Sequence, residues 1–253
     1  MGPHPVARRL YQMGVRLISF DRPGYGQSDR CPNRRVADVA PDVEAIADFL
    51  EIEEFAVLGR SGGGPHALAC AARLPTRVTR AGVLVSLAPL EAEGLDWFAG
   101  MTDSNVRHYT AAVTEPAALT VELAQAAARI RADPDIHVAT IGPEMPEPDR
   151  RVVADPGIRA LLARNFAEAL QNTAEGWIDD SLAFCGPWGF DPADIRVPVL
   201  LWHGTGDVFS PVTHTSWLAQ RIPGAIASIR PDIAHFGALE VMTRVLSWLI
   251  RPD

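Results

Sequence analysis

The chain has 253 residues, which suits one α/β domain that buries a full hydrophobic core. Its 23 lysines and arginines are outnumbered by 31 aspartates and glutamates, so the net charge is −8 and no basic cluster argues for nucleic-acid binding. The sequence has no run of 18 apolar residues and no recognisable signal peptide, so we expect a cytoplasmic protein that does not enter a membrane.

Short apolar runs rich in β-branched residues recur along the chain and predict parallel strands buried on both faces. These runs lie at residues 15–20, 55–59, 81–87, 197–204 and 225–230. Segments with helical spacing alternate with them, at residues 36–52, 61–74, 212–222 and 238–250. The alternation predicts an α/β fold with a doubly wound, mostly parallel sheet.

One region interrupts this alternation, because residues 90–194 contain no run that predicts a strand. Residues 116–133 and 155–172 have helical apolar spacing, and residues 141–151, rich in proline and charge, predict a loop between them. We therefore expect an α/β core made of residues 1–89 and 195–253, with residues 90–194 inserted between two strands as a helical cap.

Ser61 lies in the stretch VLGRSGGGPHALA, where the predicted strand 55–59 passes into a helix. A strand, a sharp turn and a helix around such a serine are typical of a nucleophile elbow. The strained turn needs small residues two positions before and after the serine, which Gly59 and Gly63 provide, and the amide of Gly62 then faces the reacting carbonyl group. The alternative is a serine that only caps the helix; a phosphate-binding loop is disfavoured because neither GxxxxGK[ST] nor GxGxxG follows the first strand.

Four segments together carry a resemblance to a known family. The chain resembles the α/β-hydrolase superfamily over nearly its whole length, and most of all the proline-iminopeptidase-like and lipase-like bacterial hydrolases with a DRPGYGxSD turn. The matching segments are FDRPGYGQSD (20–29), GRSGGGPHAL (59–68), PVLLWHGTGDVFSP (198–211) and AHFGAL (234–239). The resemblance implies that the DRPGYG turn is structural, with Asp21 in a supporting role and Gly24 and Gly26 allowing a tight reversal.

The same resemblance implies a catalytic triad of Ser61, Asp207 and His235, in the chain order that this fold uses. His235 would take the proton of the Ser61 hydroxyl group, and Asp207 would orient the imidazole and stabilise its cation. Two other histidines are weaker candidates, because His66 is expected to line its helix and His203 to pack or hydrogen-bond locally. The remaining histidines, with no companion at ligand spacing, are expected on the surface or in loops: His4, His108, His137 and His214.

Relatives in this family carry three strands and an HG loop before the part that this chain matches, and that loop supplies a second oxyanion-hole amide. The Gly62 amide is therefore the one oxyanion donor we can name. The family's third strand lies between the strands that correspond to residues 15–20 and 55–59, so its absence leaves a slot in the sheet. These two strands could pair directly, another copy of the chain could fill the slot in a homo-oligomer, or the natural start could lie upstream of Met1; we favour the last expectation.

The chemistry implied is hydrolysis of an ester, thioester, lactone or amide bond of a small, apolar substrate through an acyl-enzyme, with no cofactor and no metal. Scattered cysteines (Cys31, Cys70 and Cys185) predict neither a disulfide framework nor a zinc site. Acyl transfer, cofactor-free haloperoxidation and carbon–carbon bond hydrolysis use the same triad and stay open, as does a catalytically impaired homologue that binds a small molecule or a partner protein. Six apolar residues would line the substrate pocket or else pack the cap onto the core: Trp97, Phe98, Met101, Trp177, Phe184 and Trp188.

Overall fold

The computed structural model describes residues 7–251 of the chain. Two compact units are present. One, which we call the helical unit, comprises Met1–Asn33 and Thr102–Leu182, and the other, the sheet unit, comprises Arg34–Met101 and Ala183–Asp253. The expected core, residues 1–89 and 195–253, therefore differs from the sheet unit, because the residues before Arg34 group with the helices, whereas residues 90–101 and 183–194 of the expected cap group with the sheet. None of the helices within residues 7–251 combines the length and the apolar character needed to cross a membrane.

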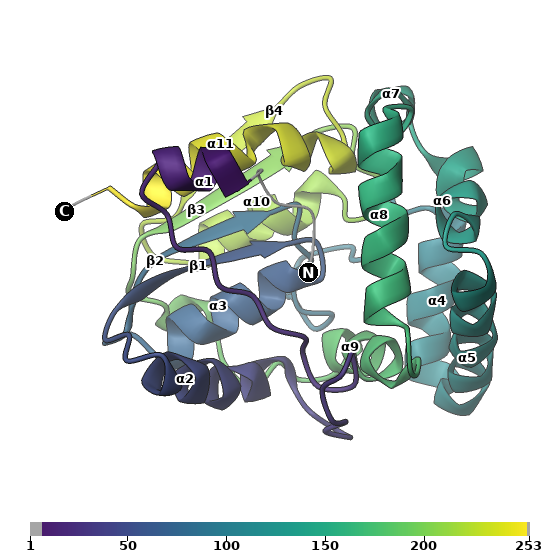
Figure 1. The fold of residues 1–253 in the computed structure, drawn as a ribbon, viewed down its shortest axis with the longest axis horizontal. Coiled ribbons are helices and arrows are strands. Elements are labelled where there is room, and N and C mark those ends of the chain that lie inside the picture. Colours follow the sequence, from purple (N-terminus) through teal and green to yellow (C-terminus); the bar gives the residue numbers. More distant parts are fainter. Residues whose placement is uncertain (1–6, 252–253) are drawn as a thin grey trace. The chain divides into compact units, whose positions relative to one another are not determined.

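The sheet unit is built on four parallel strands in the order β1-β2-β3-β4 (Figure 1). They are β1 (Phe55–Arg60), β2 (Val78–Leu84), β3 (Val199–Gly204) and β4 (Ile226–Arg230). The parallel α/β sheet is thus confirmed, and four of the five predicted strands are present, with β2 beginning three residues earlier than expected. Because all four strands run the same way, the residues that follow them meet at one edge, where ligands bind in such sheets.

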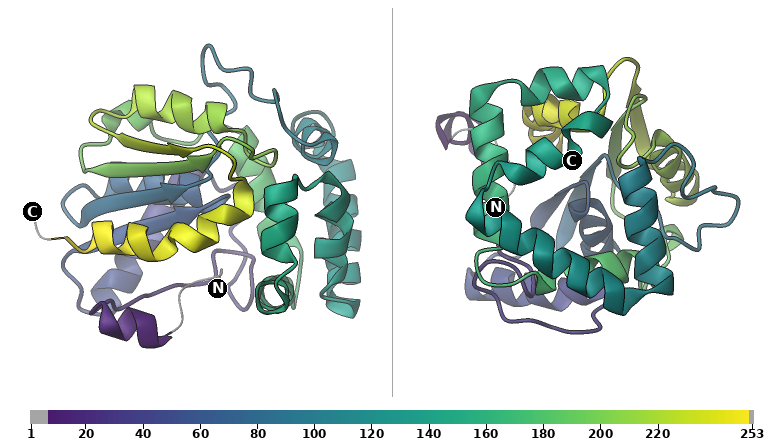
Figure 2. Two further views of the ribbon diagram at one scale, coloured as in Figure 1. Left: turned by 90° about the horizontal axis from the view of Figure 1, so that it is seen from above. Right: turned by 90° about the vertical axis from the view of Figure 1, so that its right-hand side faces the viewer.

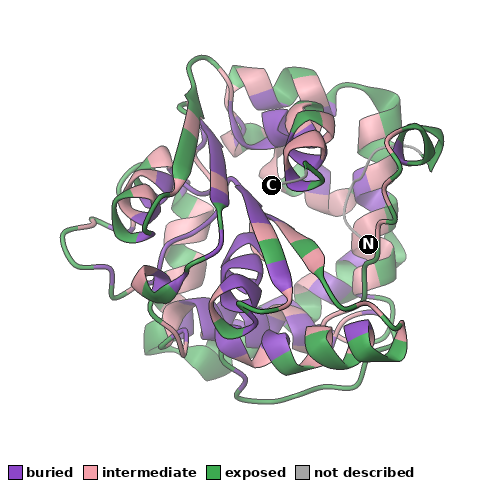
Figure 3. Ribbon diagram, turned by 90° about the vertical axis from the view of Figure 1, so that its left-hand side faces the viewer, coloured by how far each residue is buried: buried purple, intermediate pink, exposed green. Residues whose placement is uncertain are grey.

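Helices cover both faces of this sheet. On β2, a Cβ atom at Gly82 would lie 2.8 Å from Val245 on one face, whereas the side chain of the next residue, Val83, lies 3.2 Å from a Cβ atom built on Gly64 on the other face. Helices α11 (Ala238–Leu249) and α3 (Gly63–Arg73) therefore cover opposite faces (Figures 1 and 2), and β4 is exposed along most of its length (Figure 3). The helices of the sheet unit are η1 (Val36–Asp38), α2 (Val39–Phe49), α3 (Gly63–Arg73), η3 (Pro192–Asp194), α10 (Val212–Arg221), η4 (His235–Gly237) and α11 (Ala238–Leu249).

The strand predicted at residues 15–20 is wrong. These residues follow α1 (Ala7–Gln12) without forming a strand, and Ile18 and Phe20 are exposed by 41% and 37%. Of the three alternatives for the slot, direct pairing of residues 15–20 with residues 55–59 does not occur, since within the described residues β1 pairs only with β2 and forms an edge of the sheet. An apolar run forms a strand only where a neighbouring strand supplies hydrogen bonds, and no strand among residues 7–251 pairs with residues 15–20.

The helical unit holds the helices expected at residues 116–133 and 155–172 and several shorter ones. The predicted loop at residues 141–151 is wrong, because it contains η2 and the start of α7. Pro148 lies in the first turn of α7, where a missing amide proton costs nothing, and the acidic Glu147 and Asp149 suit that end of a helix. The helices are α4 (Asp103–Thr114), α5 (Pro116–Ala132), α6 (Ile136–Ile141), η2 (Gly142–Glu144), α7 (Glu147–Val153), α8 (Pro156–Ala169) and α9 (Glu175–Cys185).

Ionic contacts explain why the DRPGYG turn belongs to the helical unit. Asp180 on α9 accepts hydrogen bonds from Arg22 and, at 2.9 Å, from the hydroxyl group of Tyr25. Arg30 donates two hydrogen bonds of 2.9 Å to the two carboxylate oxygens of the neighbouring Asp179. Such bidentate pairs are the stronger kind of ion pair, so they fasten this turn to α9. The turn has the predicted tight reversal, with positive φ at Gly24 and Gly26.

Candidate active site

Ser61 follows β1 directly and has φ of +53°, a left-handed backbone conformation that is costly for a residue with a side chain. Two hydrogen bonds hold this conformation. The Ser61 amide donates to the carbonyl oxygen of Leu84 at the end of β2, at 2.8 Å, and the Ser61 carbonyl accepts from the amide of Gly64, also at 2.8 Å. The segment thus has the strand, strained turn and helix that the sequence predicts, because α3 begins at Gly63.

Of the two glycines expected to lack room for a side chain, the structure confirms Gly59 but not Gly63. A Cβ atom at Gly59 would lie 2.2 Å from the carbonyl oxygen of Gly63, so this position admits no side chain. At Gly63 the expectation is wrong, since a Cβ atom there would meet no described heavy atom within 4 Å. The second tight position is Gly64, where a Cβ atom would lie 2.3 Å from the Ser86 hydroxyl oxygen. The close approach on the helix side therefore occurs three residues after Ser61 instead of two.

Substitution of Gly59 by alanine is expected to destabilise the sheet unit, because the new methyl group collides with the backbone of Gly63 and shifts the elbow. Overpacking of this kind lowers the free energy of unfolding by about 1–3 kcal/mol, measurable by urea denaturation. The matched control is Gly63→Ala, which enters open space at the start of α3 and is expected to leave stability equal or slightly higher. Equal stability of both variants would contradict this account of the elbow.

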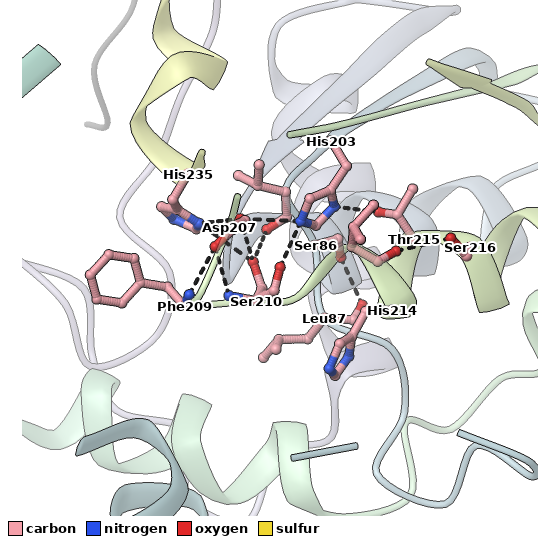
Figure 4. A network of polar contacts seen from close by, with 12 residues as sticks. Ser86, Leu87, His203, Asp207, Phe209, Ser210, His214, Thr215, Ser216 and His235 are labelled. Carbon is pink, nitrogen blue, oxygen red and sulfur yellow. Dashed lines mark hydrogen bonds and ion pairs between the residues drawn. The ribbon is translucent and has the colours of Figure 1, made fainter. Parts of the chain in front are cut away.

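Asp207 and His235 are joined as the resemblance implies. Asp207 lies in the turn after β3, and His235 follows β4 at the start of η4. The Nδ1 atom of His235 lies 2.8 Å from Oδ2 of Asp207, and both side chains are buried (Figure 4). Because a carboxylate only accepts hydrogen bonds, Nδ1 carries the proton and Nε2 keeps the lone pair that a general base needs.

The surroundings of Asp207 keep its carboxyl group ionised. Burial alone opposes ionisation, but it is outweighed by the electrostatic attraction of His235 and by hydrogen bonds from His203 and His235, which together hold the pKa of Asp207 well below its usual range. The other carboxylate oxygen, Oδ1, accepts from the amides of Phe209 at 2.8 Å and Ser210 at 3.0 Å. Asp207 is therefore a buried, charged and fully hydrogen-bonded partner for His235.

Contacts at the end of β2 connect Ser61 with the Asp207–His235 pair inside the sheet unit. Val85, which follows the Leu84 that binds the Ser61 amide, has φ of +47°, a strained value for a β-branched residue. The Val85 carbonyl oxygen accepts a 2.8 Å hydrogen bond from the hydroxyl group of Ser210, which lies 3.4 Å from His235 Nδ1. The elbow and the acid–base pair are thus brought to the same edge of the sheet.

A second contact links the neighbours of these residues in sequence. The guanidinium group of Arg60, the residue before Ser61, lies 5.3 Å from the centre of the Phe236 ring, the residue after His235. This distance is that of a cation–π interaction. It places the turn at Ser61 beside the turn that carries His235.

The sequence reasoning missed two polar residues that contact Asp207. His203 is fully buried and hydrogen-bonded, as expected, but its partners include Asp207: its Nε2 atom lies 3.1 Å from Asp207 Oδ2. The hydroxyl group of Ser210 lies 3.3 Å from the same oxygen. Both residues belong to the segment HGTGDVFS, so the four-residue spacing of His203 and Asp207 was the available signal.

The other described histidines lie on other elements of the chain. His66 is buried on α3, with Nδ1 3.4 Å from the carbonyl oxygen of Val36, as expected for a residue lining the helix. The surface position expected for His214 is wrong, since it is fully buried at the start of α10. His108 and His137 are also not in loops: they lie half-buried on helices, and burial lowers the pKa of each to about 4. His4 lies outside the described residues.

His214 makes stability depend on pH. Its Nδ1 atom accepts from the amide of Ala88 at 3.0 Å and its Nε2 atom donates to the carbonyl oxygen of Trp97 at 2.9 Å, so the ring is neutral. Burial lowers the pKa of His214 to about 4, whereas an unfolded histidine takes up a proton near pH 6.5, so the unfolded chain binds more protons between these values. Lowering the pH through this window is therefore expected to reduce the free energy of unfolding by about 1.4 kcal/mol per pH unit for this residue.

Urea denaturation of the wild-type chain and of His214→Gln at pH 7, 6 and 5 tests this expectation. The variant is expected to lose less stability per pH unit than the wild type, because glutamine does not titrate. Identical slopes for the two proteins would contradict a neutral, buried His214.

The six expected pocket residues lie in different surroundings. Trp97 is buried, donates a 2.8 Å hydrogen bond to the carbonyl oxygen of Ala88 and packs edge-on against His214, which are contacts of a core residue. Phe98, Met101 and Trp177 are half-buried, with Trp177 in the helical unit. Phe184 is buried against the elbow, because a Cβ atom at Gly62 would lie 3.2 Å from its ring.

Trp188 is buried and lines a hollow of about 670 Å³ in the sheet unit. Phe190 and Trp217 form other parts of its wall, and none of the residues that line it belongs to the Asp207–His235 pair or the elbow. This hollow is therefore separate from the acid–base pair.

Comparison with known proteins agrees with the fold. The chain belongs to the α/β hydrolase fold family, whose model matches residues 2–240. It is 30% identical over 230 residues to a pimeloyl-[acyl-carrier protein] methyl ester esterase of Aromatoleum aromaticum, covering 88% of this chain and 81% of that protein. A protein of the same name from Nitrosomonas europaea is 27% identical over 228 residues, covering 87% of this chain and 78% of that protein.

Solved structures show the same fold at lower sequence identity. A bromoperoxidase from Bacillus anthracis superposes with a TM-score of 0.67 and 17% identity, covering 96% of this chain and 83% of that chain. An esterase from Exiguobacterium antarcticum superposes with a TM-score of 0.65 and 21% identity, covering 96% of this chain and 85% of that chain. These structures establish the architecture, while the chemistry has to be argued from the site.

Proposed function

We propose that the chain is a serine-dependent carboxylic ester hydrolase that acts through an acyl-enzyme on Ser61. The observation that carries the proposal is the buried, ionised Asp207 on Nδ1 of His235, at the same sheet edge as a serine held in a strained elbow. A carboxylate–imidazole pair at the same sheet edge as a turn serine is the arrangement that activates a hydroxyl group for attack on a carbonyl carbon. The two esterases named above, similar over most of their length, support the same chemistry.

In the proposed reaction, Nε2 of His235 removes the proton of the Ser61 hydroxyl group while its oxygen attacks the ester carbonyl. Asp207 holds the imidazole in the required tautomer and stabilises the imidazolium ion that forms. His235 then gives the proton to the leaving alcohol. In the second half of the reaction, His235 removes a proton from a water molecule that attacks the acyl-enzyme, and it returns this proton to the Ser61 oxygen as the acid leaves. The result is one acid and one alcohol, with the histidine returned to its neutral form.

The oxyanion of the tetrahedral intermediate needs hydrogen-bond donors, and the amide of Gly62 is our candidate for one of them. Gly62 caps the N-terminus of α3, and the first amides of a helix have no acceptor within that helix. The partial positive charge at a helix N-terminus also favours a negative oxygen there. The ring of Phe184 beside Gly62 gives the acyl side an apolar wall, which supports an apolar acyl group as substrate.

Turnover of a series of esters tests the proposal. We expect the purified chain to hydrolyse p-nitrophenyl acetate, butyrate and octanoate, and methyl esters of the same acids, in a reaction that phosphonate inhibitors block. The names of the two curated relatives suggest that methyl esters of chain-extended acyl groups belong in the series. No turnover of any ester by well-folded protein would exclude the proposed activity and favour a binding role.

A further inference from the structure

His203 occupies a fixed place between the triad acid and the next helix. It lies on β3, and its side chain is completely buried. Three polar atoms surround the ring: Nε2 lies 3.1 Å from Asp207 Oδ2 and 2.6 Å from the carbonyl oxygen of Ser210, and Nδ1 lies 2.7 Å from the hydroxyl oxygen of Thr215 on α10 (Figure 4). Each ring nitrogen therefore has a partner.

These partners determine which nitrogen carries the proton. The carbonyl oxygen of Ser210 and the carboxylate of Asp207 only accept hydrogen bonds, so Nε2 of His203 is the donor to both. In the neutral ring Nδ1 is then an acceptor, and the hydroxyl group of Thr215 is its donor. The ring is thus held at both ends, by the turn after β3 on one side and by α10 on the other.

The contacts of Nε2 close the turn that carries the acid. Nε2 binds the side chain of Asp207 and the backbone of Ser210, the two ends of a four-residue turn, while the amides of Phe209 and Ser210 bind the other carboxylate oxygen. His203 and His235 approach the same oxygen, Oδ2, so His203 determines where that oxygen lies as it faces His235. A carboxylate held by fixed donors on all sides is preorganised.

We infer that His203 is a positioning residue: it acts through Asp207 to keep the imidazole of His235 correctly oriented, and does not itself touch the reacting atoms. This inference rests on the proposed function, because the orientation matters only if His235 is the base. A misplacement of about 1 Å in such a group lowers the rate by up to roughly 100-fold.

The test compares three substitutions of buried histidines. His203→Gln keeps an N–H donor for Asp207 and Ser210, His203→Leu removes it, and His214→Gln is the matched control, a buried histidine whose hydrogen bonds go to backbone atoms of Ala88 and Trp97. Two readouts are taken: the downfield proton NMR signal of the His235 Nδ1–H group, and kcat and KM for p-nitrophenyl butyrate.

The expected pattern separates positioning from general stability. His203→Leu should shift or broaden the His235 signal and lower kcat by about 10- to 100-fold with little change in KM, whereas His203→Gln should recover most of both and His214→Gln should change neither. If His203→Leu does not fold, Thr215→Val takes its place, since it frees the ring at Nδ1 without touching Asp207, and it should move the signal and kcat in the same direction.

Folded His203→Leu or Thr215→Val with a wild-type His235 signal and wild-type kcat would overturn the inference, as would an equal loss in His214→Gln. Failure of the proposed function looks different: the wild-type chain would then hydrolyse no ester. The NMR signal of His235 would still decide whether His203 holds the Asp207–His235 pair.

Discussion

Replacement of Ser61 by alanine is expected to reduce ester hydrolysis to the background rate. In the proposed mechanism the Ser61 oxygen forms the covalent bond to the acyl group, so no other atom of the chain replaces it. Loss of the nucleophile in serine hydrolysis lowers kcat by up to about 10⁶-fold. The measurement is the initial rate with p-nitrophenyl butyrate, together with a circular dichroism spectrum to show that the variant is folded.

The matched control for this variant is Ser247→Ala on α11, whose hydroxyl group only donates to the carbonyl oxygen of Thr243 in the same helix. It should keep the wild-type rate. Turnover in folded Ser61→Ala that approaches the rate of Ser247→Ala would show that the nucleophile lies elsewhere.

Replacement of Asp207 by asparagine is expected to lower kcat by roughly 10⁴-fold, the effect of losing the carboxylate that fixes the histidine tautomer. The asparagine amide can donate to Nδ1 of His235, which would put the proton on Nε2 and remove the lone pair that accepts the Ser61 proton. The substitution also removes the negative charge that stabilises the imidazolium ion of His235. The rate with p-nitrophenyl butyrate checks this expectation across a range of substrate concentrations.

A surface carboxylate provides the comparison for Asp207. Asp191→Asn removes an exposed acid that pairs with Arg221 and makes no contact with His235, so the rate should not change. A wild-type kcat in Asp207→Asn would contradict the assignment of the acid, and an equal loss in Asp191→Asn would mean that charge removal in general, and not orientation of His235, lowers the rate.

Most strands of this sheet could be predicted from local sequence, but it could not be predicted that β1 is an edge strand. The runs that form β1, β3 and β4 are short, apolar and followed by turn residues, and these local features are enough to predict buried parallel strands. Residues 15–20 have the same pattern and form no strand, because a strand also needs a neighbour that lies far away in the sequence. The loop predicted at residues 141–151 failed for the opposite reason, since proline and charge are also compatible with the first turn of a helix, as in α7.

The candidate site likewise combines features that local sequence predicts with features that depend on residues distant in the sequence. The elbow at Ser61 is a local motif, so its strained turn could be predicted, although the tight contact at Gly64 in place of Gly63 depends on the side chain of Ser86 from another strand end. Asp207 and His235 followed from the family resemblance, and the structure places them 2.8 Å apart. The roles of His203 and Ser210 depend on how the turn after β3 closes on itself, which spacing alone does not reveal.

Mass spectrometry after fluorophosphonate treatment tests whether Ser61 is the nucleophile that the Asp207–His235 pair activates. The chain should gain the mass of one phosphonyl group, peptide mapping should place it on Ser61, and the Ser61→Ala variant should remain unmodified. Folded wild-type protein that stays unlabelled, or that carries the label on a different residue, would contradict the claim.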